Sequence, residues 1–148
     1  MNKITPFLWF DHQAKEAVDF YVSIFPNAKI IDESSNSDDI QSISFELFNQ
    51  RFIAFNGGPY ASFSPAISMY VDCENQEEVD SYWDRLAVGG KIEQCGWLSD
   101  KYGLTWQIIP NILFDCLNHP DPIKAQKAMD AMLKMTKINV NELLDAIK

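Results

Sequence analysis

The order of predicted elements near the start of the chain recurs about 61 residues later, and a repeat of this kind constrains the fold more than any single motif. Hydrophobic periodicity gives the same strand–helix–strand order in both copies. Identical residues also fall at matching places in the two copies: Asp11 and Asp72, Val18 and Val79, Asp19 and Asp80, Tyr21 and Tyr82. We therefore expect two βαβββ modules.

The first copy combines two periodicities. Short apolar runs and alternating apolar and polar residues predict strands over residues 4–10, 28–32, 42–47 and 51–56. Between the first two strands, apolar residues recur every three or four positions, which predicts a helix over 13–25 that Pro26 ends. Residues 33–39 (ESSNSDD) are polar, and we expect them to form a loop.

The second copy contains predicted strands over residues 66–73, 91–98 and 104–109. Asn75 lies three residues before Glu78, a spacing typical of a helix N-terminus, and Gly89-Gly90 ends this helix. The rest of the chain is predicted to be helical over 111–117, 122–135 and 140–147. The apolar residues of these helices fit docking on the chain's own sheet, a dimer interface, or both.

A length of 148 residues suits one domain, so we expect an α+β fold in which residues 1–148 form a single domain. Module one spans about 3–60, module two about 65–110, and a helical extension about 111–148. Each module's sheet has one face for its own helix and one face left over. Two such curved mixed sheets can enclose a cavity that holds a small molecule.

The charge balance limits the partners. The formal net charge is −9 and the chain has only two arginines, which argues against a nucleic acid or an anionic membrane as a partner. The three cysteines show no Cys-x-x-Cys spacing, so we expect neither a disulfide framework nor a zinc knuckle. Because no signal peptide or membrane-spanning apolar run is evident, a soluble cytoplasmic protein is expected.

Four segments carry a resemblance to a known family. In chain order they are FDHQAKEAVDFYVSIFPNAKI, FNGGP, VDCENQEEVDSYWDRL and QCGWLSDKYGLTWQIIP. They resemble the PhnB-like branch of the glyoxalase/bleomycin-resistance (vicinal oxygen chelate) superfamily, whose members often carry the label 3-demethylubiquinone-9 3-methyltransferase. The resemblance covers residues 3 to about 135. It implies paired βαβββ modules, a homodimer and, commonly, a divalent metal held by His and Glu on the first and last strands of the modules.

The metal ligands that the resemblance implies are not evident in this sequence. The chain has two histidines, His12 and His119, and neither falls on a predicted strand. Metal-dependent relatives would have Glu where Gln107 stands. Neutral amides are poor ligands for Zn²⁺, Ni²⁺ or Fe²⁺ and good hydrogen-bond partners for a polar molecule. We therefore expect no metal and no cofactor.

The candidate site combines polar anchors with aromatic walls. Asn56 falls opposite Gln107 if Pro59 is matched to Pro110, and these two amides are the predicted anchors. Cys95 shares one face of its predicted strand with Trp97, and without a nearby histidine or cation it is not expected to act as a nucleophile. Catalytic residues are not assigned. The predicted ligand-binding residues are Trp9, Asn56, Cys95, Trp97, Trp106 and Gln107.

The leading hypothesis is a PhnB-like protein that binds a small polar or aromatic molecule in a metal-free cavity, with catalysis left open. A 3-demethylubiquinone 3-methyltransferase is a second hypothesis, although no Gly-x-Gly turn opens a helix as the usual S-adenosylmethionine sites require. A metal-dependent lyase or dioxygenase is a third, and a drug-sequestering protein like the bleomycin-resistance members is a fourth. The expected partners are a small-molecule ligand and a second copy of the chain.

Overall fold

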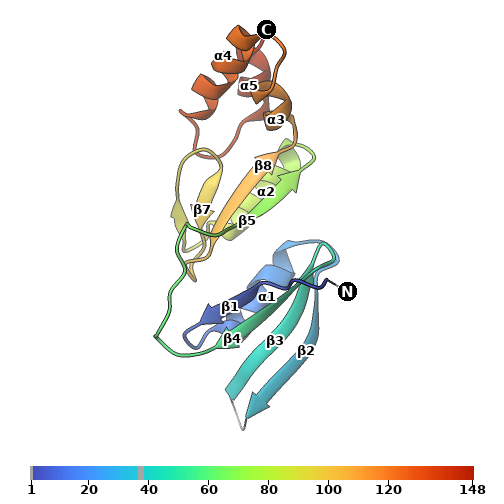
Figure 1. The fold of residues 1–148 in the computed structure, drawn as a ribbon, viewed down its shortest axis with the longest axis vertical. Helices are drawn as coiled ribbons and strands as arrows, with labels where there is room; N and C mark the ends of the chain where they lie inside the picture. The colour runs from blue at the N-terminus through green and yellow to red at the C-terminus, as the bar shows by residue number, and fades with distance from the viewer. Residues whose placement is uncertain (1, 37–38) are drawn as a thin grey trace. The chain divides into compact units, whose positions relative to one another are not determined.

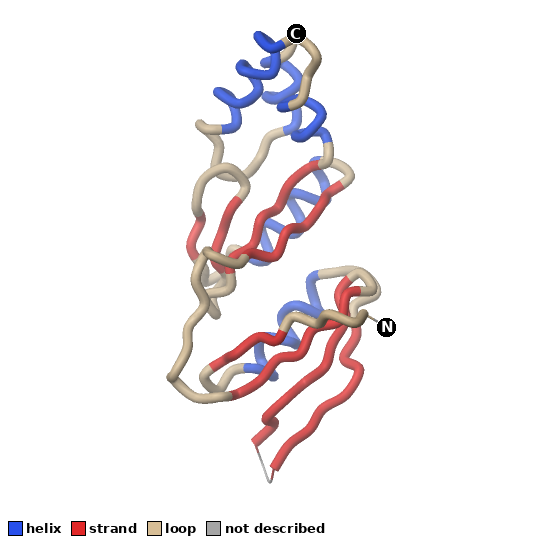
Figure 2. Tube along the Cα trace, in the orientation of Figure 1, coloured by secondary structure: helices blue, strands red, loops and turns tan. Residues whose placement is uncertain are grey.

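The computed structural model describes residues 2–36 and 39–148. The chain divides into two compact units, residues 1–63 (unit 1) and residues 64–148 (unit 2). Each unit has a four-stranded sheet with a helix on one face, and unit 2 has a helical extension (Figures 1 and 2). The predicted α+β class and the two βαβββ modules are confirmed.

Unit 1 contains β1 (Phe7–Phe10), α1 (Ala14–Ile24), β2 (Lys29–Asn36), β3 (Asp39–Leu47) and β4 (Gln50–Asn56). The sheet order is β1-β4-β3-β2, with β1 parallel to β4 and the other pairs antiparallel. The helix α1 packs on β3 and β4. Its Tyr21 ring stacks on Phe45, and Phe45 stacks on Phe52, so alternate residues of these strands form the core with the helix.

Unit 2 contains β5 (Ser68–Cys73), α2 (Gln76–Leu86), β6 (Lys91–Ile92), β7 (Trp97–Ser99) and β8 (Thr105–Pro110). The sheet order is β5-β8-β7-β6, again with one parallel pair, β5 with β8. The predicted N-cap of α2 is confirmed, because the Asn75 side chain accepts a hydrogen bond from the N–H of Glu78 at 2.9 Å.

The two units repeat with an offset that differs from the predicted one. The last ladder pairs are Phe10 with Asn56 in unit 1 and Cys73 with Pro110 in unit 2. Phe10 therefore corresponds to Cys73, an offset of 63 residues, while the helices of 11 residues each start 62 residues apart. The identities 61 residues apart are therefore out of step with the structural repeat by one or two residues, although Val18, Val79, Tyr21 and Tyr82 are all buried.

The predicted loop over residues 33–39 is wrong for the residues that the structure describes. The strand β2 continues to Asn36 and β3 begins at Asp39, while residues 37 and 38 lie outside the described part. Ser34 pairs with Ser42 across the ladder. Because β2 is an edge strand, its polar residues pair in the ladder without facing a core, and a polar composition does not distinguish such a strand from a loop.

The predicted continuous strand over residues 91–98 is also wrong. Residues 93–96 are not strand, because Cys95 and Gly96 have positive φ values of 59° and 84°. Their N–H groups donate to the carbonyls of Met135 and Thr136, each at 2.8 Å. The backbone here leaves the ladder to meet the C-terminal part of the chain, so alternation between two faces does not hold for Cys95.

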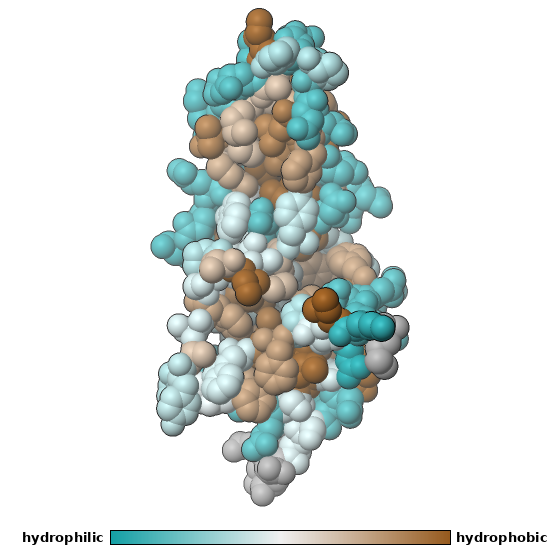
Figure 3. Space-filling view, in the orientation of Figure 1, coloured by the Kyte–Doolittle hydropathy of each residue, from teal (hydrophilic) through white to brown (hydrophobic). Residues whose placement is uncertain are grey.

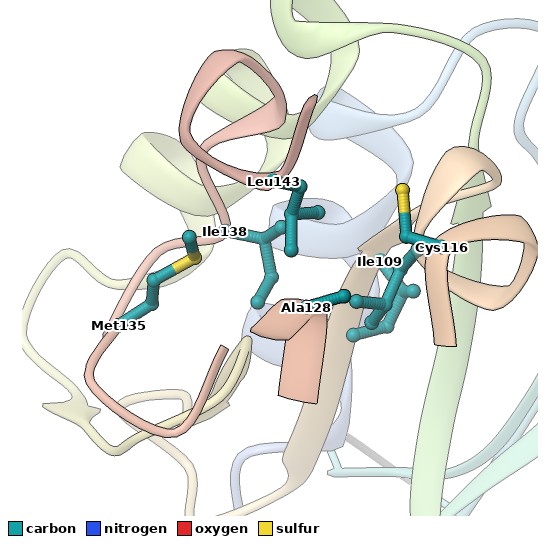
Figure 4. Packing of buried hydrophobic residues seen from close by; sticks show 7 residues of the cluster. Ile109, Cys116, Ala128, Met135, Ile138 and Leu143 are labelled. Carbon is teal, nitrogen blue, oxygen red and sulfur yellow. The ribbon is translucent and has the colours of Figure 1, made fainter. Parts of the chain in front are cut away.

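The helical extension consists of α3 (Ile112–Leu117), α4 (Pro122–Met132) and α5 (Val140–Ala146). It encloses a core of its own with the end of β8, as Figure 4 shows. On the face seen in Figure 3, hydrophobic and hydrophilic side chains are interspersed over these helices. The buried residues of this core are Ile109, Leu113, Cys116, Ala128, Met135, Ile138 and Leu143. The predicted docking of these helices on the chain's own sheet is therefore observed.

Among the described residues, no helix is long and apolar enough to cross a lipid bilayer.

Candidate functional site

Each sheet has one face packed on its own helix and an opposite face, which we call the far face. In the first sheet, Phe52 and Ala54 of β4 are buried toward α1, so Arg51, Ile53 and Phe55 lie on the far face. In the second sheet, Trp106 and Ile108 of β8 are buried toward α2. The far face of the second sheet therefore carries the alternate residues of β5, β7 and β8: Ser68, Tyr70, Asp72, Trp97, Ser99, Thr105, Gln107 and Ile109.

Gln107 lies at the centre of the far face of the second sheet, between two aromatic residues. Tyr70 is its ladder partner on β5 and Trp97 its partner on β7. Its Nε2 donates to the Oγ of Ser68 at 2.9 Å, which fixes the orientation of the amide plane. Gln107 and Trp97 are half-buried and Tyr70 is exposed. A hydrogen-bonding amide with a ring on each side is suited to a planar polar molecule.

The phenol of Tyr70 stays neutral at physiological pH. Partial burial raises the pKa of Tyr70 above its usual value, and the nearby Asp72 carboxylate adds to the rise. The Tyr70 ring also contacts the Phe114 ring of α3, with 6.2 Å between the centroids. The extension thus reaches the edge of this far face.

Trp106 belongs to the core and not to the far face. It is only 2% exposed, and because it is adjacent to Gln107 on β8 the two side chains point to opposite sides of the sheet. Its Nε1 donates to the carboxylate of Asp100 at 2.9 Å. This buried carboxylate also accepts the backbone N–H groups of Tyr102 and Leu104, which closes the β7–β8 turn.

Asn56 points toward the helix and not toward the far face. Its Oδ1 accepts the N–H of Ala14 at 2.8 Å and so caps α1, whose own N-cap residue Gln13 makes no side-chain cap bond. The predicted match between Asn56 and Gln107 is wrong. Counting back from the last ladder pair of each unit, Gln107 corresponds to Ile53.

Trp9 lies on the far face of the first sheet in a fixed position. Its Nε1 donates to the carbonyl of Gly58 at 2.9 Å, and its ring meets the Phe55 ring edge-on at 5.3 Å between centroids. A Cβ on Gly57 would overlap the indole, so only glycine allows this approach of the ring to the backbone. Trp9 is therefore placed as a rigid half-buried surface.

The cysteines do not form a reactive pair in the described part of the chain. Burial raises the pKa of Cys73 to about 12, with the carboxylates of Glu78 and Asp72 adding to the rise, and burial also raises the pKa of Cys116. Both are therefore neutral thiols at physiological pH. Cys95 is half-buried in the irregular segment before β7, with its backbone held to the extension.

The strands that would hold a metal in superfamily relatives do not offer a suitable set of ligands here. The far faces of β1, β4 and β8 present aromatic, aliphatic, arginine, threonine and glutamine side chains, and β5 adds the carboxylate of Asp72. The side chains of Ser68 and Gln107 are hydrogen-bonded to each other. No cluster of three His, Cys, Asp or Glu side chains suited to a metal occurs within residues 2–36 and 39–148. These residues do not fit a divalent cation.

Three residues of the far faces are absent from the predicted set of ligand-binding residues. Ser68 and Tyr70 become neighbours of Gln107 only through the parallel pairing of β5 with β8. Arg51 lies beside the aromatic residues of the first sheet. The alternation of buried and exposed residues along β4 and β8 shows which of their side chains share a face. The residues beside them on that face can be identified only when the neighbouring strands are known.

Comparison with protein families gives one match. A family model described as 3-demethylubiquinone-9 3-methyltransferase matches residues 2–109. The match includes both sheets up to the last residues of β8 and ends before the helical extension. A search of curated proteins returned no match.

Solved structures similar to this chain support the same grouping. A putative 3-demethylubiquinone-9 3-methyltransferase, PhnB protein, from Bacillus cereus is 34% identical with a TM-score of 0.70, and the match covers 74% of this chain and 99% of that one. A protein from Pseudomonas aeruginosa is 18% identical with a TM-score of 0.62, covering 74% and 98%. The fosfomycin resistance protein FosX from Listeria monocytogenes, complexed with Mn(II) and sulfate, is 18% identical with a TM-score of 0.53, covering 71% and 86%. The last two similarities concern the fold alone.

Proposed function

Because the chain belongs to the 3-demethylubiquinone-9 3-methyltransferase family, a PhnB-like branch of the glyoxalase/bleomycin-resistance superfamily, we propose that it binds a small polar or aromatic molecule without a metal. The far face of the second sheet is the proposed site. The observation that carries this proposal is the row Tyr70–Gln107–Trp97, in which an amide fixed by Ser68 lies between two rings.

The chemistry of this row favours a neutral planar ligand. The Gln107 amide is oriented by its bond to Ser68, and its carbonyl oxygen offers an acceptor to an incoming N–H or O–H group. The rings of Tyr70 and Trp97 supply apolar surface on each side. We also propose, as the resemblance implies, that the two units act as one ligand-binding domain and that the chain forms a homodimer.

Methyl transfer to a quinone, which the family description names, finds no support in the residues. The described helices that follow strands β1 and β5 are preceded by Gln13 and Asn75, and no glycine-rich turn opens either helix for a nucleotide. Micromolar binding of S-adenosylmethionine, measured by calorimetry and lost in Gln107→Ala, would instead support methyl transfer as the function.

The test of the proposed site is a binding measurement with aromatic amides and phenols as probes, by saturation-transfer NMR in buffer containing EDTA. We expect binders whose affinity falls about fivefold or more, or about 1 kcal/mol, in Gln107→Ala and in Trp97→Ala. Gln126→Ala, an exposed glutamine of α4, is the matched control and should bind as the unaltered chain does. Binding that requires an added divalent cation, or whose affinity is unchanged in Gln107→Ala, contradicts the proposal.

A further inference from the structure

Arg51 is a half-buried cation on the far face of the first sheet, and one of only two arginines in the chain. Its Nη2 donates to the Oγ of Ser44 on β3 at 3.3 Å. Its Nε is buried and has no hydrogen-bond acceptor. Because this Nε is shielded from solvent, an acceptor from outside the chain would reach the guanidinium through Nη1 and Nη2, and among the described residues Nη1 makes no hydrogen bond.

No carboxylate of the described residues forms an ion pair with Arg51. Glu46 is its ladder partner across β3 and β4, but the Glu46 carboxylate pairs with Lys29 on the other side at 3.5 Å. The neighbouring Ser44 is neutral. The guanidinium thus makes no direct ion pair in the described part of the chain, and in this partly desolvated place an anion gains more from pairing than it does in bulk water.

An apolar surface adjoins this cation. Along β4 the far face continues from Arg51 to Ile53 and Phe55, and the ladder partner of Ile53 on β1 is Phe7. The Phe7 and Phe55 rings are 5.5 Å apart between centroids, and the Trp9 ring meets Phe55 edge-on at 5.3 Å. Arg51 and Phe55 lie four positions apart on β4, about 13 Å at the rise of a strand, which is long enough for a two-ring molecule with one acidic group.

From these contacts we propose that the far face of the first sheet binds planar aromatic carboxylates. The guanidinium of Arg51 takes the carboxylate, whose two oxygens match the fork of N–H groups, and the ring system lies on Ile53 and Phe7 toward Phe55. The site lies wholly in unit 1 and uses no residue of the Tyr70–Gln107–Trp97 row. It therefore goes beyond the proposed function and can fail or succeed independently of it.

The experiment compares 2-naphthoate with its neutral isostere 2-naphthamide, by isothermal titration calorimetry on the full chain and on the full chain carrying Gln107→Ala, in which the amide site proposed for unit 2 is weakened. We expect naphthoate to bind at least about tenfold more tightly than naphthamide, and this preference to vanish in Arg51→Gln. Arg51→Lys keeps the charge without the fork and should keep part of the preference. In the chain carrying Gln107→Ala, Phe7→Ala should weaken both probes, and because Phe7 is 57% exposed the position tolerates substitution.

Two controls separate this site from the rest of the chain. Arg85→Gln removes the other arginine, on α2, and should leave naphthoate binding unchanged. Gln107→Ala should also leave it unchanged, so a loss in that variant assigns naphthoate to the proposed site of unit 2 and overturns the inference. Equal binding of the two probes, no naphthoate binding at all, or an unaltered preference in Arg51→Gln likewise overturns it.

Discussion

At the scale of single residues, Trp106 and Gln107 show how one position on a strand decides the role of a side chain. They are adjacent on β8, yet the indole is 2% exposed and bonded to Asp100, whereas the amide lies half-buried on the far face. Residue type alone predicts both as ligand-binding residues, since aromatic and amide residues suit a site. Because successive side chains of a strand point to opposite faces, only one of the two can lie on the far face, and the buried face of β8 must be known to tell which one.

The buried carboxylate of Asp100 joins the β7–β8 turn to the core through three hydrogen bonds. We expect Asp100→Ala to lower the free energy of unfolding by about 2–4 kcal/mol, because it leaves the Trp106 Nε1–H and the N–H groups of Tyr102 and Leu104 without this acceptor. Urea unfolding followed by circular dichroism measures the change. Asp130→Ala, on the exposed face of α4, is the control and should change stability by less than about 0.5 kcal/mol. A loss no larger than that of the control contradicts the assigned role.

At the scale of elements, the helices and most strands are predictable from the sequence within a few residues because their periodicities are local. The exceptions are positions where a distant segment supplies the hydrogen bond. Asn56 caps α1 from β4, and Cys95 and Gly96 leave the ladder because carbonyls of residues 135 and 136 receive their N–H groups. Neither arrangement has a local signature, since the partners lie about 40 residues away along the chain.

The connector between α4 and α5, residues 133–139, is held to α2 by both polar and charged contacts. Gln76 donates to the carbonyl of Ile138 at 3.0 Å and accepts the N–H of Val140 at 2.7 Å. Lys137 pairs with Asp84 at 2.9 Å and with Asp80 at 3.2 Å. The hydrogen bond from Gln76 and the Lys137 ammonium lower the pKa of Asp80. These contacts hold the connector on α2.

We expect Lys137→Met to lower stability at pH 7 by about 0.5–1 kcal/mol, since the ion pairs are partly exposed. A lowered carboxyl pKa contributes stability above the usual carboxyl range, and this contribution is lost as pH falls through the pKa of the folded state. The difference between the two proteins should therefore shrink at pH 3, as thermal unfolding at both pH values can measure. Lys134→Met, an exposed lysine of the same connector, should show no pH-dependent difference. An effect of Lys137→Met that is equal at both pH values contradicts the ion-pair account.

At the scale of the whole molecule, the family match ends at the end of β8, and the helical extension begins there. The match ends at residue 109, and the Bacillus cereus protein is covered over 99% of its length by 74% of this chain. The extension is nevertheless part of the core of unit 2, because Ile109 packs with the buried residues of α3, α4, α5 and the connector (Figure 4). Its Phe114 also contacts Tyr70 on the far face. The helical extension thus contacts the proposed site in this chain through Phe114.

Ile138 tests how strongly the extension is coupled to the second sheet. This connector residue is fully buried in the same core as Ile109, so we expect Ile138→Ala to lower the free energy of unfolding by about 2–4 kcal/mol. Because the connector would loosen, the amide protons of Cys95 and Gly96 should exchange faster with solvent, as hydrogen exchange measured by NMR can show. Ile123→Ala removes the same atoms from a side chain that is 68% exposed, and both stability and exchange should then stay nearly unchanged. If Cys95 and Gly96 keep their protection in Ile138→Ala, the extension is attached to unit 2 without supporting the strand that carries Trp97.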